Sequence, residues 1–171
     1  GGCSYVGKME VAEAAKMIEN TQRDIDIAFV NELSTIIPKM GLDVMEVLEA
    51  ASTKWNFHRH TPGIGVGGHC IPVDPYYYIQ CSKGVGSIST LSPSARQINE
   101  SMPEYSAQQI SEILGGTGSI LILGLAYKPN VGDIRETPVL QMINALTNEG
   151  ISSRVWDPLI RVPIDLPEKC K

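Results

Sequence analysis

A continuous apolar run from Ser119 to Leu125 is the sequence feature that most constrains how this chain can fold. A run of this length suits a strand that is buried on both faces, as in a parallel sheet. A helical pattern follows from about Thr137 to Glu149, Gly150 ends it, and residues 153–158 have the pattern of a second strand. We therefore expect a βαβ unit, the start of a doubly wound α/β layer.

The amino-terminal part of the chain has a helical pattern. Apolar residues recur at three- and four-residue steps from Met9 to Ile37, and this spacing predicts one long helix. Pro38 should end the helix, because proline lacks an amide donor and its ring clashes with the preceding turn. Asp43 is expected to be the N-cap of a second helix, Val44 to Ala51.

Residues 52–92 are dense in glycine, proline, histidine and tyrosine, and helix signals are scarce there. A helix should resume near Pro93, which suits a first-turn position, and run toward Leu114. Pro103 lies inside that span and should kink or break the helix.

Two strands make a poor sheet, since three or more with a covered face are usually needed. The predicted fold class is therefore α/β: an all-helical central domain over residues 9–116, then an incomplete Rossmann-like parallel α/β domain over residues 117–171. Residues 1–8 show no periodicity and are expected to be a linker or a cut end.

The balance of charge excludes some classes of partner. The 171 residues include 14 lysine and arginine against 19 aspartate and glutamate residues, a net charge of −5. This acidic balance, without basic clusters, argues against nucleic acid as the main partner. No apolar run reaches the ~20 residues that cross a bilayer, and we expect neither a membrane span nor a signal segment. Four widely spaced cysteines without a Cys-x-x-Cys pair favour reduced thiols and a cytoplasmic location.

Two sequence patterns suggest ligand sites that we do not expect. Histidines and cysteines gather at His58, His60, His69, Cys70 and Cys81, but zinc sites usually show tighter paired spacing, so no metal is predicted. Gly63 to Gly68 satisfies G-x-G-x-x-G, which binds dinucleotides only between a strand and a helix N-terminus. Neither flank fits here. What remains is a glycine-rich loop whose backbone can approach a ligand closely and that leads to His69 and Cys70.

The whole segment PGIGVGGHCIPVDPYYY, residues 62–78, is far more specific. It resembles the active-site loop of the UDP-glucose/GDP-mannose dehydrogenase family, nucleotide-sugar dehydrogenases that oxidise C6 of the sugar to a carboxylate. The resemblance continues through VAEAAKMIENTQRDIDIAFVNEL, ARQINESMP and LILGLAYKPNVGDIRETP, and it covers nearly all of residues 9–158. The TKWNF and GGHC segments are most similar to the UDP-N-acetylhexosamine branch, because UDP-glucose enzymes typically have serine where His69 stands.

The resemblance implies two successive hydride transfers to NAD without release of the aldehyde, and it implies roles for four catalytic residues. Cys70 matches the nucleophile that forms a thiohemiacetal and then a thioester. Lys16 matches an ammonium that steadies the alkoxide and oxyanion. Asn20 and Asp74 match the pair that positions and deprotonates the hydrolytic water. From the residues alone, Asp74 could instead be a turn aspartate before Pro75.

The resemblance also implies binding residues. Those expected at the UDP-sugar are Arg23, Gly67, His69, Tyr127 and Lys128, and Arg135 is expected to reach the cofactor. Lys16, Asn20 and Arg23 share one helix face, which alone could be a solvated face, but apolar Ile27 and Val30 continue it and suggest that it is covered. Arg135 could also be a surface salt-bridged arginine, and Tyr76 to Tyr78 are interpreted as structural.

The expected function is therefore NAD-dependent oxidation of a UDP-N-acetylhexosamine for polysaccharide assembly, in a cytoplasmic homodimer formed through the helical domain. The family's amino-terminal NAD domain has no counterpart in this sequence, so the chain alone is expected to be inactive. An alternative is a non-catalytic dimerisation and UDP-binding module, and a third is a metal-binding protein.

Overall fold

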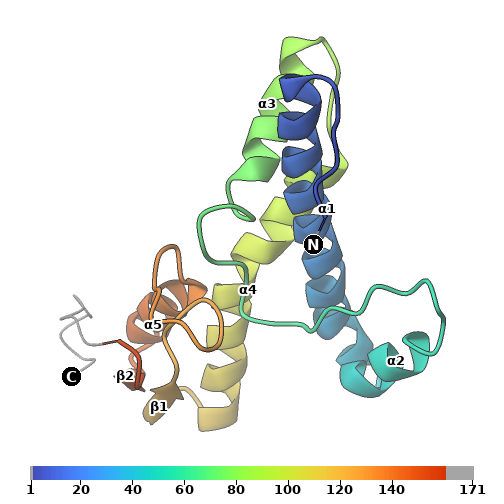
Figure 1. Cartoon of the computed structure of the whole chain (residues 1–171). Helices are drawn as coiled ribbons and strands as arrows, with labels where there is room; N and C mark the ends of the chain where they lie inside the picture. Colours follow the sequence, from blue (N-terminus) through green and yellow to red (C-terminus); the bar gives the residue numbers. More distant parts are fainter. Residues whose placement is uncertain (1, 161–171) are drawn as a thin grey trace.

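The computed structural model describes residues 2–160 and confirms the α/β fold class (Figure 1). Two long helices and a shorter one lie alongside one another, and a small α/β unit lies against the carboxyl-terminal half of the second long helix. The elements in chain order are α1 (Met9–Ile36), the 3₁₀ turn η1 (Ile37–Met40), α2 (Val44–Ala51), α3 (Asp74–Gly84), α4 (Leu91–Leu114), β1 (Ser119–Leu123), α5 (Pro138–Asn148) and β2 (Ser152–Trp156).

The end of α1 and the start of α2 follow the predicted local signals. α1 ends at Ile36, and Pro38 lies in the first turn of η1, where a missing amide costs little. Gly41 closes this turn with a φ of 76°, a left-handed conformation that favours glycine. The Asp43 carboxylate then accepts hydrogen bonds from the amides of Met45 (2.7 Å) and Glu46 (3.0 Å), so the predicted N-cap is confirmed.

One expectation about the middle of the chain is wrong, and of the kink or break expected at Pro103 the break does not occur. Helix α3 lies within the stretch in which helix signals were scarce, because three successive tyrosines give no apolar stripe for a pattern search to find. Helix α4 is not broken at Pro103, which is fully buried within it. Proline removes the donor that the carbonyl of Asn99 would otherwise receive. The oxygen of that carbonyl lies close to Gly65 of the glycine-rich loop, 2.9 Å from where a Cβ at Gly65 would be.

The predicted βαβ unit is confirmed, with β1 and β2 parallel and Ser119 paired with Ser152. Helix α5 buries its apolar face against α4 and the strands, in a cluster formed by Ala107, Leu125, Val139, Met142, Ile143, Leu146 and Ile151. The other face of the pair is exposed: Leu121 and Leu123 are 58% and 71% accessible. The expectation that β1 is buried on both faces is therefore wrong within the described residues.

None of the helices within residues 2–160 combines the length and the apolar character that crossing a bilayer requires. Residues 161–171, which include Cys170 and the end of the predicted α/β domain, lie outside the described part of the chain.

Candidate active site

The glycine-rich loop, residues 63–68, is hydrogen-bonded at its start to the helical part of the molecule and at its end to the α/β part. At its start, the amide of Gly63 donates to the side-chain oxygen of Asn31, a buried residue of α1, at 2.8 Å. Further on, the amide of Gly68 donates to the carbonyl of Arg135 at 3.0 Å. The loop therefore joins the helical layer to the segment between β1 and α5.

The glycines of this loop make room for protein atoms. A Cβ built at Gly67 would lie 2.6 Å from Cβ of Tyr127 and 2.8 Å from the carbonyl oxygen of Glu136. At Gly68, whose φ is 88°, a Cβ would lie 2.9 Å from the Tyr127 ring. The sequence predicts that this backbone can approach a ligand closely. In the structure it is Tyr127 and its neighbours that the backbone approaches. No strand precedes the loop, so it lacks the flanks of a dinucleotide fingerprint, as expected.

Cys70 follows the loop and begins the turn that leads into α3. Its carbonyl accepts hydrogen bonds from the amides of Val73 (3.1 Å) and Asp74 (2.8 Å), and its side chain is an exposed free thiol. Asp74 is the first residue of α3, and its Oδ2 accepts a hydrogen bond from Nδ2 of the buried Asn20 at 2.5 Å. The structure therefore brings Asn20, Asp74 and the Cys70 backbone together, although 50 residues or more separate α1 from this turn in the sequence.

Lys16 and Arg23 lie on the same side of α1 as Asn20, but both are exposed, and both pair with Glu19. Nζ of Lys16 is 2.6 Å from one carboxylate oxygen of Glu19, and Nη2 of Arg23 is 2.9 Å from the other. The Lys16 hydrogen bond is the main reason that the pKa of Glu19 is lowered. Sequence reasoning missed Glu19, although its spacing from both cations is that of helical ion pairs. The expectation that this face is covered holds for Asn20 and Val30 and fails for Lys16 and Arg23.

Tyr127 and Lys128 lie beyond the carboxyl end of β1, where open α/β sheets bind ligands. The Lys128 ammonium lies 5.4 Å from the centroid of the Tyr127 ring. Lys128 also lines a cleft of about 250 Å³ together with Gly124, Ala126, Pro129, Asn130, Val131, Asp157, Pro158 and Leu159.

Asp157 ties together the strand ends at this cleft. Its carboxylate accepts hydrogen bonds from the amides of Leu125 (2.8 Å), Ala126 (3.2 Å) and Leu159 (2.9 Å). These backbone donors, that of Leu125 first, lower the pKa of Asp157. Asp157 was not predicted, and its position directly after the second strand is the signal that could have found it.

Arg135 holds Asp133 with several hydrogen bonds, two of them from Nε at 2.9 and 3.0 Å. These bonds lower the pKa of Asp133 to about 2. The same pairing is the main cause of a raised pKa for Arg135, and the charge of Cys70 adds to it at lower weight. A positive charge on His69 would lower the pKa of Asp133 slightly further. The Arg135–Asp133 pair therefore lies within electrostatic reach of the turn that carries His69 and Cys70.

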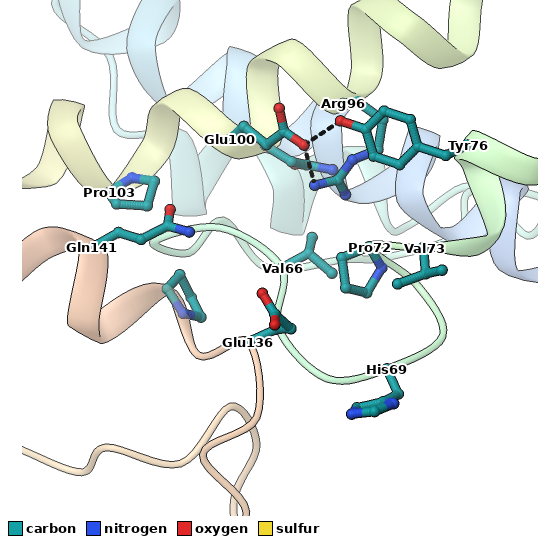
Figure 2. Close-up of a pocket in the computed structure, with 12 residues that line it drawn as sticks. Val66, His69, Pro72, Val73, Tyr76, Arg96, Glu100, Pro103, Glu136 and Gln141 are labelled. Carbon is teal, nitrogen blue, oxygen red and sulfur yellow. Dashed lines mark hydrogen bonds and ion pairs between the residues drawn. The ribbon is translucent and has the colours of Figure 1, made fainter. Parts of the chain in front are cut away.

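A cavity of about 350 Å³ lies inside the arc of the loop, between α3, α4 and α5 (Figure 2). It is lined by Val66, His69, Pro72, Val73, Tyr76, Arg96, Asn99, Glu100, Pro103, Glu136, Pro138 and Gln141. Of the predicted site residues only His69 contributes to it, and Cys70, Lys16, Asn20 and Asp74 do not line it. Within residues 2–160, no three His, Cys, Asp or Glu side chains are grouped closely enough to hold a metal ion.

Comparison with known proteins establishes which class of protein has this fold and loop. The model of the UDP-glucose/GDP-mannose dehydrogenase family, central domain, matches residues 10–101. The model of the same family's UDP binding domain matches residues 121–166. The chain belongs to the UDP-glucose/GDP-mannose dehydrogenase family.

Several individual relatives are named as N-acetylhexosamine dehydrogenases. The chain is 41% identical to a UDP-N-acetyl-D-glucosamine 6-dehydrogenase of Salmonella typhi, over 89% of this chain and 37% of the relative. It is 37% identical to a UDP-N-acetyl-D-mannosamine dehydrogenase of Methanocaldococcus jannaschii, over 94% of this chain and 37% of the relative. The solved UDP-D-ManNAc dehydrogenase of Pyrococcus horikoshii superposes with a TM-score of 0.81 at 38% identity, over 93% of this chain and 39% of that one. The chain thus spans about two fifths of the length of these relatives.

Proposed function

We propose that this chain supplies the nucleophile and the water-activating pair of an enzyme that oxidises C6 of a UDP-N-acetylhexosamine to the carboxylate. The observation that carries the proposal is the hydrogen bond between Asn20 and Asp74, four residues from the exposed Cys70. The family's UDP binding domain over residues 121–166 supports a UDP-linked substrate. The names of the relatives in Salmonella typhi and Methanocaldococcus jannaschii support an N-acetylhexosamine.

Cys70 acts on the aldehyde that the first oxidation of C6 produces. Its sulfur forms a bond to C6 while the carbonyl oxygen takes up a proton, which gives a thiohemiacetal. The second oxidation removes a hydride from C6 and a proton from that oxygen, which leaves a thioester on Cys70. The aldehyde is never released, because it stays bound through sulfur.

Asn20 and Asp74 act on the thioester. Asp74 takes a proton from a water molecule, and the water oxygen bonds to C6. The C–S bond then breaks, the carboxylate leaves, and Cys70 is free for another cycle. The Asn20 amide orients the Asp74 carboxylate through the observed hydrogen bond. Lys16 would stabilise the negative charge on the C6 oxygen. To do so, its ammonium must leave the Glu19 carboxylate and contact the substrate oxygen instead.

The remaining predicted contacts belong to the substrate. Arg23, Gly67 and His69 would face the sugar and its phosphates from the helical part, while Tyr127 and Lys128 would contact the nucleotide. Lys128 already lines the cleft at the strand ends. A lysine at such a position is suited to an anionic diphosphate.

NAD would accept a hydride in each oxidation when bound. The described residues supply only part of a binding site for it. At Gly67 and Gly68, Tyr127, Glu136 and Pro138 occupy the space beside the backbone that a pyrophosphate would need. Arg135, the residue expected at the cofactor, is engaged by Asp133. The described residues therefore fit the sugar chemistry and do not form a complete dinucleotide site.

Replacement of the nucleophile tests the proposal. In the complete enzyme that contains this chain, supplied with NAD and a UDP-N-acetylhexosamine, Cys70→Ser should abolish uronate formation. Cys81→Ser is the matched control, because Cys81 is also an exposed free thiol but lies on α3. The control should retain uronate formation. Normal turnover by Cys70→Ser would contradict covalent catalysis through Cys70.

The alternative, a non-catalytic dimerisation and UDP-binding module, is favoured by the incomplete dinucleotide site. Titration calorimetry of this exact chain with UDP and with NAD tests the module: tight NAD binding opposes it, whereas binding of UDP alone agrees with both candidates. The intact mass of the protein in the cell completes the comparison, since a mass near 18.6 kDa corresponds to this chain.

A homodimer in the cytoplasm that serves polysaccharide assembly belongs to the same proposal. Apolar side chains along α1 remain accessible, among them Ile18 (54%) and Phe29 (52%), and they are suited to a helix-to-helix interface. Sedimentation equilibrium tests the dimer: twice the chain mass is expected, and a monomer at micromolar concentration would contradict it.

A further inference from the structure

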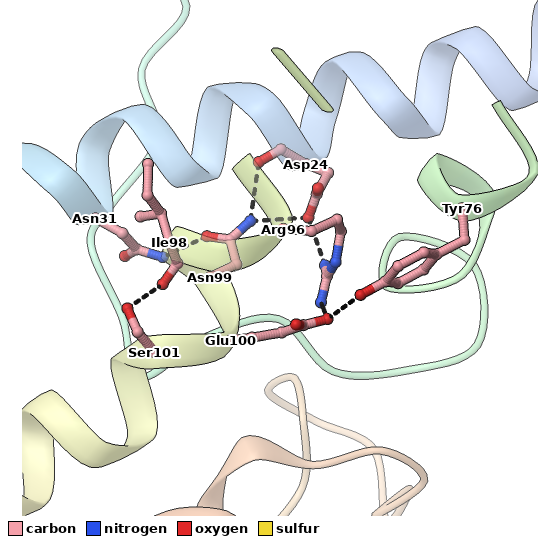
Figure 3. A network of polar contacts seen from close by, with 8 residues as sticks. All are labelled: Asp24, Asn31, Tyr76, Arg96, Ile98, Asn99, Glu100 and Ser101. Atoms are coloured by element: carbon pink, nitrogen blue, oxygen red, sulfur yellow. Dashed lines mark hydrogen bonds and ion pairs between the residues drawn. The ribbon is translucent and has the colours of Figure 1, made fainter. Parts of the chain in front are cut away.

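A chain of polar contacts links helices α1, α4 and α3 (Figure 3), buried at its Asp24–Arg96 end and exposed where Tyr76 meets Glu100. On α4, Nη1 of Arg96 donates to Oδ1 of Asp24, a fully buried residue of α1, at 2.7 Å. Nη2 of the same arginine donates to Oε1 of Glu100 at 3.0 Å. The hydroxyl of Tyr76, on α3, donates to that same oxygen at 2.5 Å. The chain thus runs from α1 through α4 to α3.

This chain of contacts closes into a ring through the candidate active site. Asp24 lies one helical turn after Asn20 on α1, and Tyr76 lies two residues after Asp74 on α3. The hydrogen bond from Asn20 to Asp74 joins the same two helices directly. The direct α1–α3 bond and the route through α4 therefore constrain the same geometry, the position of the first turn of α3 against α1.

The ring has features that burial alone would disfavour. Burial is the largest influence on the pKa of Asp24 and raises it, against the opposing charge of Arg96. Oδ2 of Asp24 and Nε of Arg96 have no hydrogen-bond partner among the described residues. A buried ion pair of this kind is often no more stabilising than apolar side chains of equal volume. Its presence is better explained by the geometry it imposes than by the stability it adds.

We propose that Arg96 and Tyr76 are positioning residues for thioester hydrolysis, holding Asp74 at Asn20 by way of Glu100 and Asp24. This proposal rests on the proposed function. Addition of the Cys70 sulfur to the aldehyde needs no water, whereas hydrolysis needs Asp74 aligned with the attacking water. In that step the water oxygen bonds to C6, the C–S bond breaks with its electron pair going to sulfur, and the water proton goes to Asp74. A loosened ring therefore slows hydrolysis selectively, since misplacement by about 1 Å costs up to about 100-fold in rate.

Tyr76→Phe is the test, because it removes only the hydroxyl that reaches Glu100. Tyr77→Phe is the matched control, since Tyr77 is the next residue on α3 and is 62% exposed. In the complete enzyme with NAD and substrate, rapid quenching and mass analysis of the Cys70 peptide report the acylated fraction. Tyr76→Phe should lower kcat by roughly 10- to 100-fold, lower KM in parallel and accumulate acyl-Cys70. Tyr77→Phe should match the wild type.

Two outcomes overturn the proposal. Wild-type kcat and acylation in Tyr76→Phe would show that the ring does not act on hydrolysis. A fall in kcat/KM without acyl accumulation would show a merely structural role. Normal turnover by Cys70→Ser would instead refute the proposed function, and this proposal with it.

The ring can also be tested without catalysis. In this chain alone, the side-chain amide signals of Asn20 in an ¹⁵N–¹H spectrum should shift in Tyr76→Phe and stay in place in Tyr77→Phe. Unshifted Asn20 signals in Tyr76→Phe would refute the coupling between the two ends of the ring.

Discussion

Gly67→Ala tests whether the glycine-rich loop is packed as tightly as the structure indicates. The new methyl group would lie 2.6 Å from Cβ of Tyr127, 2.8 Å from the carbonyl oxygen of Glu136 and 3.1 Å from Cδ of Pro138. These atoms belong to the backbone or are attached directly to it, so no side chain can rotate away. Overpacking of this kind costs about 1–3 kcal/mol. Alanine restricts the unfolded chain and returns about 0.4–1 kcal/mol, which leaves a net loss of about 1–2 kcal/mol.

Gly63→Ala provides the control within the same loop. No atom lies within 4 Å of a Cβ built there, and Gly63 is not among the glycines with a positive φ. This variant should equal the wild type or gain up to about 1 kcal/mol. Urea unfolding followed by circular dichroism measures both, and the thermal midpoint of Gly67→Ala should fall by roughly 2–8 °C in a chain of this size. Equal midpoints for the two variants would refute the packing of Gly67 against Tyr127.

Two further predictions concern charged pairs. Arg135→Gln should raise the pKa of Asp133 from about 2 toward its ordinary 3.8, because the hydrogen bonds from Arg135 are what lower it. A carboxyl NMR titration measures this, Asp157 should stay unchanged in the same spectra, and an unmoved Asp133 would contradict the pairing. The pKa of Asp133 is lower in the folded state than in the unfolded state, so this pair stabilises the fold at pH values above about 3.8. In the wild type this stabilisation should be lost as the pH falls from about 3.8 to about 2. Arg96→Met should cost about 3–5 kcal/mol in urea unfolding, because it leaves the Asp24 charge buried and unpaired. Asp24→Asn combined with it should recover part of that loss, and strictly additive losses would rule out the coupling.

The parts of the fold that could be predicted are those decided by neighbours in the sequence. The cap at Asp43 and the stop at Pro38 each depend on a few adjacent residues, and each strand of the parallel pair has its own apolar pattern. Helix α3 escaped prediction because its residues are ordered by contacts with α1 and α4 and not by an amphipathic pattern of their own. The exposed face of β1 escaped for a similar reason, since an apolar run does not say which of its faces this chain covers.

The candidate site likewise has one part that could be predicted from the sequence and one part that could not. Asn20 and Asp74 were proposed as a pair from resemblance, and the structure places them in contact. The ring that surrounds them could not be predicted, because Asp24 and Arg96 are charged residues on helices, a type that is rarely buried unless paired. The spacing of Arg96 and Glu100 on α4 indicates an ion pair, but only the packing of the helices shows that Arg96 is buried while Glu100 stays half exposed.

The position of the Cys70 thiol therefore depends on both halves of the molecule. The loop that carries it is bonded to α1 through Gly63 and Asn31, and to the α/β unit through Gly68 and Arg135. A loop bonded at one end only could move with that half, whereas one bonded at both ends takes a position that the two halves determine jointly. Since Asn31 also donates to Asn99 on α4, the loop and the buried polar contacts share one set of helices. The Cys70 thiol and the Asn20–Asp74 pair are thus positioned by a common framework, as the proposed reaction with its bound intermediate would require.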